Sequence, residues 1–257
     1  MNRETLLEAR NIAKHFGGVR ALHAVSLFIL RGEIYGVIGP NGAGKTTFFN
    51  VLTGLYTADG GSFLLDGAPM KISAPHEVAA QGIARTFQNI RLFANMTALE
   101  NVMVGRHLRT GAGVIGAVLR DRATRDEESA IAQRAHELLH YVGIHRHSNV
   151  LARNLSYGDQ RRLEIARALA TEPKLLALDE PAAGMNATET AELRKLIETL
   201  RSDGVTILLI EHDVKLVMGL CDRVAVLDYG EKIAEGAPAE VRRDAKVVEA
   251  YLGGAIA

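Results

Sequence analysis

A glycine-rich segment that ends in lysine and threonine is the clearest chemical signal in this sequence. Residues 39–46 read GPNGAGKT and satisfy the pattern G-x-x-x-x-G-K-[ST]. An apolar run, 34–38, precedes the segment, and an apolar helical pattern, 46–55, follows it. In such a setting the glycines turn backbone N–H groups toward phosphate oxygens, Lys45 neutralises their charge, and Thr46 offers its hydroxyl to Mg²⁺. The segment therefore predicts a nucleotide phosphate site.

An acidic pair supplies the carboxylates that such a site requires. Residues 175–180 read LLALDE, an apolar run that ends in two acids. Because side chains alternate along a strand, Asp179 can face a magnesium ion while Glu180 faces the γ-phosphate and activates the attacking water. By itself, an acidic strand end is equally typical of a solvated strand terminus.

Short apolar runs alternate with helical patterns and predict an α/β fold. The runs 34–38, 175–178, 205–210 and 224–227 are typical of parallel strands that are buried on both faces. Leucine and isoleucine recur at helical spacing over 187–203, and Gly204 follows as a stop signal. Residues 25–30 and 62–65 are candidates for an antiparallel layer. We expect a helical subdomain from about residue 89, with a helix over 129–142 and a Gly-rich surface insertion over 105–119.

The composition excludes several classes of protein. The chain has 257 residues, 30 Lys and Arg against 30 Asp and Glu, and a single cysteine. With a pI near 7.1 it has no overall basic field of the kind that attracts nucleic acid. Cys221 cannot form an intrachain disulfide, so we expect a small core side chain in a reducing compartment. No signal-peptide core is found in 1–14, and no apolar run approaches the roughly 20 residues that span a bilayer.

A further segment, 154–162, reads NLSYGDQRR and resembles the signature loop of ABC-transporter ATPases. The other motifs of that family follow in the family's order. They are Phe16 in KHFGG, Gln88 in TFQN, the segment 183–186 (AGMN) after Pro181, and His212 after Ile210 and Glu211. The resemblance covers about residues 6–252, so the chain is identified as a member of this family.

The resemblance implies a P-loop NTPase fold: a RecA-like parallel core with an antiparallel β layer (1–88 and 160–235), a helical subdomain with the signature loop (89–159) and a C-terminal helical extension (236–257). It also implies that ATP is bound with Mg²⁺, and that Phe16 stacks on adenine. The expected catalytic residues are Glu180, His212 and Gln88, and the expected magnesium ligands are Thr46, Gln88 and Asp179. The expected nucleotide-binding residues are Phe16, Gly39, Asn41, Gly42, Gly44, Lys45, Thr46 and Thr47.

In this family the signature loop serves the P-loop of a second subunit, across a head-to-tail dimer. We expect Ser156 to cap a helix over 163–170, and Ser156, Gly158 and Asp159 to reach the γ-phosphate of the opposite chain. The partner is a second copy or a paralogue. The resemblance also implies two separate permease subunits that contact Gln88 and residues 89–100, an indirect link to a solute-binding protein, no nucleic-acid partner, and a place on the cytoplasmic face of the plasma membrane.

Two departures from the common motifs narrow the resemblance. Tyr157 and Asp159 replace the usual Gly and Gln of the signature, and Asn186 stands where Asp is usual. Together with GVIGPNGAGKTTFFNVLTGLY over 36–56, they resemble the ATP-binding subunits of branched-chain amino-acid importers. Transport of urea or short amides, lipid export, and action on a soluble macromolecular assembly are the alternatives.

A competing motif occurs at 136–140, HELLH, which matches the zinc-protease pattern H-E-x-x-H. The longer form of that pattern requires histidine at position 146, where this chain has arginine. We therefore reject the metalloprotease interpretation and expect His136 and His140 to lie on a helix whose polar residues face water.

Overall fold

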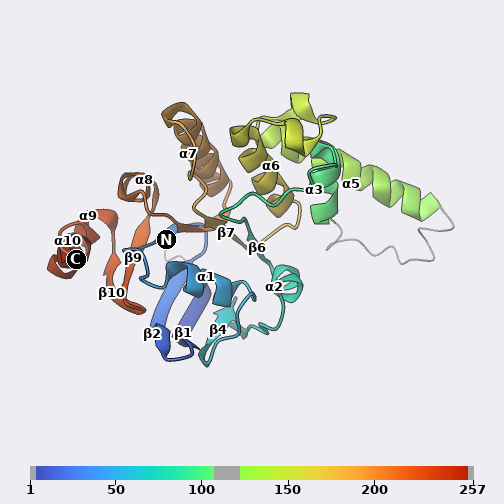
Figure 1. Cartoon of the computed structure of the whole chain (residues 1–257). Coiled ribbons are helices and arrows are strands. Elements are labelled where there is room, and N and C mark those ends of the chain that lie inside the picture. The colour runs from blue at the N-terminus through green and yellow to red at the C-terminus, as the bar shows by residue number, and fades with distance from the viewer. Residues whose placement is uncertain (1–3, 107–121, 254–257) are drawn as a thin grey trace.

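Two β-sheets form the framework of the protein (Figure 1). The computed structural model describes residues 4–106 and 122–253. The larger sheet has the order β10-β9-β3-β8-β7-β6 and is parallel except for β10 at one edge. Its strands are β3 (Ile34–Ile38), β6 (Ile83–Arg85), β7 (Leu175–Asp179), β8 (Thr206–Ile210), β9 (Arg223–Asp228) and β10 (Glu231–Gly236). The four runs predicted as buried parallel strands are confirmed as β3, β7, β8 and β9.

The smaller sheet is antiparallel and has the order β2-β1-β4-β5. Its strands are β1 (Thr5–Phe16), β2 (Val19–Leu30), β4 (Gly60–Leu65) and β5 (Ala68–Pro69). Both strands predicted for this layer are confirmed within β2 and β4, and each pairs with β1, which lies between them. One hydrophobic core joins the two sheets, since β1 and β2 residues pack with α1 and with one face of the larger sheet.

Helices cover the larger sheet and its two ends. The helix predicted over 187–203 is α7, and its regularly spaced Leu193, Leu196, Ile197 and Leu200 are buried as expected. At the end of the sheet where β9 and β10 lie, α9 and α10 pack beside those strands (Figure 1). The helices around this framework are α1 (Lys45–Leu52), α2 (Pro75–Gln81), α7 (Ala187–Ser202), α8 (Val214–Leu220), α9 (Pro238–Val241) and α10 (Ala245–Gly253).

A group of helices on the other side of the molecule packs together as a lobe (Figure 1). It contains α3 (Ala98–Arg106), α5 (Arg122–Tyr141), α6 (Tyr157–Leu169) and short 3-10 turns at His145–His147 and Ala152–Asn154. The predicted start of the last helix was wrong: α6 begins at Tyr157, not at residue 163. The reason is local. The Ser156 side chain accepts from the Asp159 N–H and so caps the helix, which places Gly158 and Asp159 of the signature in its first turn.

The Gly-rich insertion predicted over 105–119 is only partly described. Gly105 and Arg106 belong to α3, and a Cβ on Gly105 would come within 2.3 Å of the Arg167 carbonyl oxygen. This glycine therefore allows α3 to approach α6 closely, which corrects the expectation of an irregular segment there. The rest of the insertion lies outside the described residues.

The parallel strands place the chemically interesting residues along one edge. Each of these residues follows the carboxyl end of a strand, the edge where open α/β sheets bind ligands. Gln88 follows β6, Glu180 follows β7, Lys45 follows β3 and His212 follows β8. Among residues 4–106 and 122–253, no helix combines the length and the apolar character needed to cross a membrane.

Candidate active site

The segment 39–46 wraps into a loop whose shape depends on two glycines. Gly39 has φ 154°, and a Cβ there would lie 2.1 Å from the Leu227 carbonyl oxygen in β9. Gly44 has φ 100° and caps α1, where a Cβ would lie 2.6 Å from the Ala21 carbonyl oxygen. Only glycine fits at both places, so the loop is pressed between β9 and β2 and leads directly into the N-terminus of α1. The positive end of α1 faces the loop interior.

Lys45 spans this loop from the inside. The side chain is buried, and its Nζ donates to the carbonyl oxygens of Gly39 and Pro40 at 2.8 and 2.9 Å. Burial lowers the pKa of this amine, and the charge of Glu180 partly opposes the shift. An anion that enters the loop would stabilise this partly desolvated ammonium, whose hydrogen bonds go to two carbonyl oxygens.

A cavity of about 320 Å³ opens beside the loop. Its walls come from the loop, from the first turn of α1, from the start of β2, from the end of β7 and from the turn after β9. The lining residues are Val19, Arg20, Ala21, Asn41, Gly42, Ala43, Gly44, Lys45, Thr46, Thr47, Glu180 and Tyr229. Six of the eight residues predicted to bind nucleotide thus line this cavity together with Glu180: Asn41, Gly42, Gly44, Lys45, Thr46 and Thr47.

The three residues predicted to be catalytic meet at one oxygen atom. Gln88 Nε2 donates to Glu180 Oε2 at 2.7 Å, and His212 Nδ1 lies 3.6 Å from the same Oε2. Glu180 has a positive φ of 43°, and its N–H donates to the Ile210 carbonyl at 2.8 Å. A non-glycine residue in this conformation is strained, and such strain concentrates at functional sites. The side chain is 16% exposed and lines the cavity beside the loop.

Asp179 lies one residue earlier and faces a different environment, as strand alternation predicted. Its carboxylate is buried, with Arg85 Nη2 at 3.8 Å. Burial raises the pKa of this carboxyl to about 6, although Arg85 opposes the shift. The half-buried guanidinium of Arg85 lies over the Phe49 and Phe87 rings, and desolvation lowers its pKa to about 10. The sequence reasoning missed Arg85, although a lone basic residue at the end of the short apolar strand β6 was a visible signal.

The chemistry of these residues fits a magnesium ion. Mg²⁺ takes oxygen ligands and is usually held by one or two carboxylates together with substrate phosphates. Thr46 supplies a hydroxyl in the cavity, Asp179 supplies a buried carboxylate that a dication would stabilise, and Gln88 supplies an amide. No group of three or more His, Cys, Asp or Glu side chains suited to a metal occurs within residues 4–106 and 122–253. The oxygen atoms of Thr46, Asp179 and Gln88 are donors of the kind that hold Mg²⁺ together with substrate phosphates.

The residues predicted to act across a dimer lie apart from this cavity. Ser156 Oγ accepts from the Asp159 N–H at 3.2 Å and donates to Asp159 Oδ2 at 2.8 Å. Gly158 packs on the Glu189 side chain in α7. These three signature residues line a separate hollow of about 140 Å³, and in the described part of the chain none of them lines the cavity beside Lys45.

A buried ion pair connects the signature helix to the segment that carries Gln88. Arg161 Nη1 donates to the Phe87 carbonyl at 2.5 Å and to Glu164 Oε2 at 3.0 Å, and Arg161 Nη2 donates to the Gln88 carbonyl. Glu164 accepts from the N–H groups of Phe87 and Arg91 at 3.3 and 3.4 Å. Both side chains are 1% exposed. The sequence reasoning missed this pair, because Arg161 and Arg162 are adjacent and either could have been the buried one. Only the three-residue helical spacing between Arg161 and Glu164 distinguishes Arg161 from its neighbour.

Phe16 ends β1 at a short distance along the chain from the cavity wall at Val19. Its ring is 44% exposed, meets Tyr56 edge-on with centroids 5.3 Å apart, and has Lys14 Nζ 5.4 Å from its centroid. Among the described residues the cavity wall on this side is made by Val19, Arg20 and Ala21, and Phe16 is not part of it.

The departure at Asn186 has a structural explanation. Asn186 caps α7 by accepting from the N–H groups of Thr188 and Glu189 at 2.9 and 3.0 Å, and Glu189 accepts from the Asn186 N–H at 2.9 Å. Asn and Asp are equivalent in such a capping box. The other departure, Tyr157, donates from its hydroxyl to the Ala183 carbonyl at 2.8 Å and so ties the signature to the segment before Asn186.

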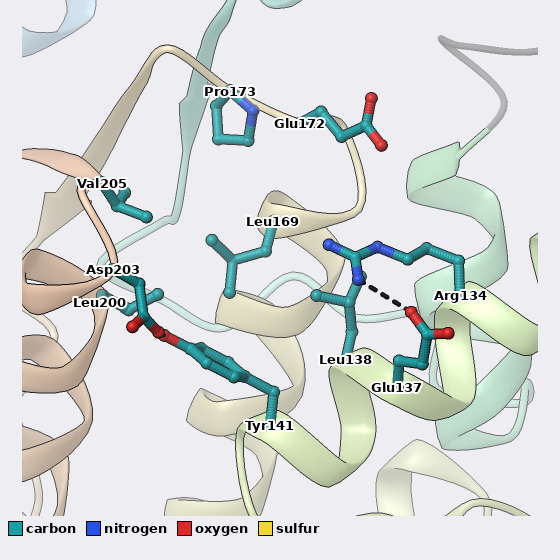
Figure 2. A pocket seen from close by; sticks show the side chains of 10 residues that line it. All are labelled: Arg134, Glu137, Leu138, Tyr141, Leu169, Glu172, Pro173, Leu200, Asp203 and Val205. Atoms are coloured by element: carbon teal, nitrogen blue, oxygen red, sulfur yellow. Dashed lines mark hydrogen bonds and ion pairs between the residues drawn. The ribbon is translucent and has the colours of Figure 1, made fainter.

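The HELLH motif lies in a different part of the molecule, on α5. Figure 2 shows Glu137 turned toward Arg134, with which it forms an ion pair at 2.9 Å on the rim of an apolar pocket. The His140 ring lies against His145, with centroids 4.9 Å apart. On the other rim the Tyr141 hydroxyl donates to Asp203 at 2.5 Å and links α5 to the end of α7 (Figure 2). Glu137 is therefore engaged as an ion-pair partner.

Known proteins resemble this chain over almost its whole length. The family model described as ABC transporter matches residues 22–183, and one described as branched-chain amino acid ATP-binding cassette transporter matches 231–257. The chain is 46% identical, over 97% of its length and 98% of the relative, to the high-affinity branched-chain amino acid transport ATP-binding protein LivG of Escherichia coli K12. It is 44% identical to BraF of Pseudomonas aeruginosa, which carries the same description, over 96% of this chain and 98% of the relative.

Solved structures give the same result. The chain superimposes on MJ1267 in its ADP conformation, an ATP-binding cassette of an ABC transporter, with a TM-score of 0.84 and 33% identity over 97% of this chain and 99% of that one. It also matches the dimeric structure of MJ0796, a bacterial ABC transporter cassette, with a TM-score of 0.76 and 26% identity over 91% and 99% of the two chains.

Proposed function

The chain belongs to the ATP-binding subunits of ABC transporters, and from this premise we propose that it energises uptake of branched-chain or related amino acids through separate permease subunits. The observation that carries the proposal is the meeting of Gln88 and His212 at one oxygen of Glu180, beside a glycine-rich loop closed by Lys45. The names of the LivG and BraF relatives support the substrate class.

We propose the following roles in ATP hydrolysis. The loop N–H groups and the N-terminus of α1 bind the phosphates, and Lys45 exchanges the Gly39 and Pro40 carbonyls for β- and γ-phosphate oxygens. Glu180 accepts a proton from the attacking water as a general base. Gln88 and His212 orient the Glu180 carboxylate and lie beside the γ-phosphate. Phe16 contacts the adenine.

Magnesium fits the same scheme as a cofactor. Thr46, Asp179 and Gln88 would hold the ion, and when bound it supplies positive charge that neutralises the phosphate oxygens. Arg85, whose guanidinium donates to Thr53 and lies over the Phe49 ring, would keep the Asp179 carboxylate in place.

We further propose that hydrolysis requires a second cassette, either another copy or a paralogue. Ser156, Gly158 and Asp159 would contact the γ-phosphate bound to that partner, because the capped N-terminus of α6 is an anion site of the right kind. The separation of the signature hollow from the Lys45 cavity supports this arrangement. ATP would then favour the closed pair by bridging both surfaces, and loss of the γ-phosphate would reopen it.

A groove next to Gln88 is the proposed site for the permease. It has a volume of about 290 Å³ and lies between α2 on one side and α3 and α6 on the other. Phe87 and Phe93 line it, and Phe93 is 47% exposed. The groove is thus apolar and adjoins the segment that carries Gln88. A permease bound there would hold this chain as a peripheral subunit at the cytoplasmic face of the membrane. A solute-binding protein would act from the other side of that permease.

Uptake by cells that depend on this chain tests the proposal. We expect Lys45→Ala to abolish ATP-dependent accumulation of labelled leucine, isoleucine and valine, and Arg20→Ala, a change at the rim of the same cavity, to retain most of it. Loss of urea uptake with leucine uptake unchanged would overturn the substrate assignment. Uptake that persists in Lys45→Ala would overturn the assignment of this chain as the motor.

A further inference from the structure

Two of the large hydrophobic side chains flanking the Lys45 cavity are unusually exposed. Among the described residues Tyr229 is 87% exposed and Val19 is 66% exposed, the highest values for large hydrophobic side chains. Both line the cavity, one at the turn after β9 and the other at the start of β2. A single exposed hydrophobic side chain is ordinary at a protein surface, so the two exposures gain meaning here from their place on the rim of one cavity.

The turn that carries Tyr229 is fixed to the phosphate loop. Gly230 donates from its N–H to the Ala43 carbonyl at 3.0 Å and accepts from the His23 N–H at 2.8 Å. A Cβ on Gly230 would lie 2.8 Å from the Ala21 carbonyl oxygen, so the turn sits tightly on β2. The position of Tyr229 is therefore set relative to the nucleotide site, and its side chain is presented from a firmly held backbone.

Tyr229 also adopts a strained backbone conformation. Its φ is 44°, in the left-handed region that disfavours a bulky residue. The turn would form more easily with Asn or Gly at this position, and the exposed ring buries little surface within its own chain. A residue that costs the fold energy without packing inside it is typical of a functional surface.

We propose that Tyr229, with Val19, is a contact point for the second ATP-binding cassette, where the ring packs against the partner when ATP closes the pair. This inference rests on the proposed function. The signature residues Ser156, Gly158 and Asp159 do not line the cavity that these residues flank. In the proposed function the signature of a partner completes the cavity, so a contact at Tyr229 would extend the same surface. Tyr is the kind of residue that dominates interface energy.

The order of the strands argues against the permease as the occupant. Tyr229 follows β9, whereas the groove proposed for the permease adjoins β6, and three strands of the sheet, β3, β8 and β7, lie between β9 and β6. The nucleotide itself is the other possible occupant, and binding to the isolated chain distinguishes it.

The test uses the complete transporter, purified by a tag on this chain. A photoreactive benzoylphenylalanine replaces Tyr229 or, as the matched control, Tyr56, which is 40% exposed, contacts Phe16 and does not line the Lys45 cavity. We expect position 229 to cross-link this chain to another cassette in MgATP and not without nucleotide, and position 56 to give no such product. Cross-linking of position 229 to the permease, or no cross-link to a cassette in MgATP, would overturn the proposal.

Substitutions separate the partner contact from nucleotide binding and from folding. We expect Tyr229→Ala to leave ATP affinity of the isolated chain within about twofold, and to raise the ATP concentration for half-maximal hydrolysis by the transporter about tenfold. Tyr229→Phe should behave like the unsubstituted protein, while Tyr229→Asn should raise Tm because it relieves the backbone strain, yet impair hydrolysis as Ala does. Tenfold weaker ATP binding by the isolated Tyr229→Ala chain would overturn the proposal in favour of a nucleotide contact.

Hydrolysis and cross-linking together distinguish a failure of the proposed function from a failure of the proposed Tyr229 contact. An unsubstituted transporter that does not hydrolyse ATP would contradict the proposed function. Normal hydrolysis without a cross-link from position 229 would contradict only the role of Tyr229.

Discussion

Arg161 reaches from the signature helix to the backbone of Phe87, where its Nη1 donates to the carbonyl oxygen at 2.5 Å. Its Nη2 donates to the next carbonyl, that of Gln88. The same helix carries Ser156 at its N-terminus, and Gln88 contacts Glu180 at the other end of the connection. The signature helix and the segment that carries Gln88 are therefore held together through a buried guanidinium.

Replacement of Arg161 should destabilise the protein, because its ion-pair partner Glu164 is buried. Arg161→Met leaves the Glu164 carboxylate, which is 1% exposed, without its ion-pair partner, so we expect the free energy of unfolding to fall by about 3 to 5 kcal/mol in urea titrations. The double variant Arg161→Met, Glu164→Gln should recover part of that loss, because the amide oxygen still accepts from Phe87 and Arg91 without a buried charge. Equal destabilisation by the single and the double variant would contradict this account.

Glu180→Gln tests the general base. The amide keeps the size of the side chain but cannot accept the proton, so turnover should fall by about 10² to 10⁴ while ATP binding remains intact. Hydrolysis and nucleotide binding are measured on the same preparation, and light scattering with MgATP and then MgADP reports pairing. We expect the mass to double with MgATP only; normal turnover would show that another residue is the base.

Much of the site could be predicted from the sequence, because the spacing of residues along the chain determines the geometry of contacts between near neighbours. Residues 39–46 with their flanking strand and helix, and Asp179 and Glu180 at a strand end, depend on contacts close in the chain, and the structure places them along one edge of the sheet. The main contacts of Ser156 and Asn186 are likewise local, since both are helix caps that act within three residues. Such interactions leave a recognisable pattern.

Long-range burial leaves a much weaker pattern. Arg161 meets Phe87 across 74 positions, and Asp179 meets Arg85 across the β6–β7 pair, so neither partner could be identified from its neighbours in the chain. The start of α6 was predicted six residues late because Gly158 and Asp159 disfavour helix by propensity, whereas the Ser156 cap and packing against Glu189 outweigh that preference. The exposed ring of Tyr229 depends on a turn conformation that the sequence did not indicate.

Asn186→Asp should be nearly neutral, because aspartate caps a helix as well as asparagine and its charge is favourable at the N-terminus of α7. Asn186→Ala removes both acceptor bonds and should lower the free energy of unfolding by about 1 kcal/mol. Urea unfolding of the three proteins measures the difference. If Asp destabilises as much as Ala, the role of Asn186 is not capping.

Protonation of Asp179 should control magnesium binding. The folded pKa of about 6 lies above the ordinary value of 3.8, so at pH 5 most of the metal-free protein carries a proton on the proposed ligand. We expect the apparent affinity for Mg²⁺ in the presence of ADP to fall about tenfold per pH unit below pH 6 and to level off above pH 7. Titration calorimetry from pH 5 to 8 measures this dependence.

The pKa of Asp179 should also affect the stability of the metal-free protein. Here the protonated carboxyl is the favourable form, whereas magnesium binding needs the carboxylate. A carboxyl whose folded pKa exceeds its unfolded value favours the folded state while protonated, so Asp179 destabilises the fold increasingly as pH rises from about 4 to about 6. The full effect is on the order of 3 kcal/mol for a shift of this size. Asp179→Asn, which stays neutral, should remove this part of the pH dependence and gain stability relative to the unsubstituted protein above pH 6, while it loses the affinity for Mg²⁺. If Asp179→Asn retains the full pH dependence of magnesium binding, a different group is the titrating ligand.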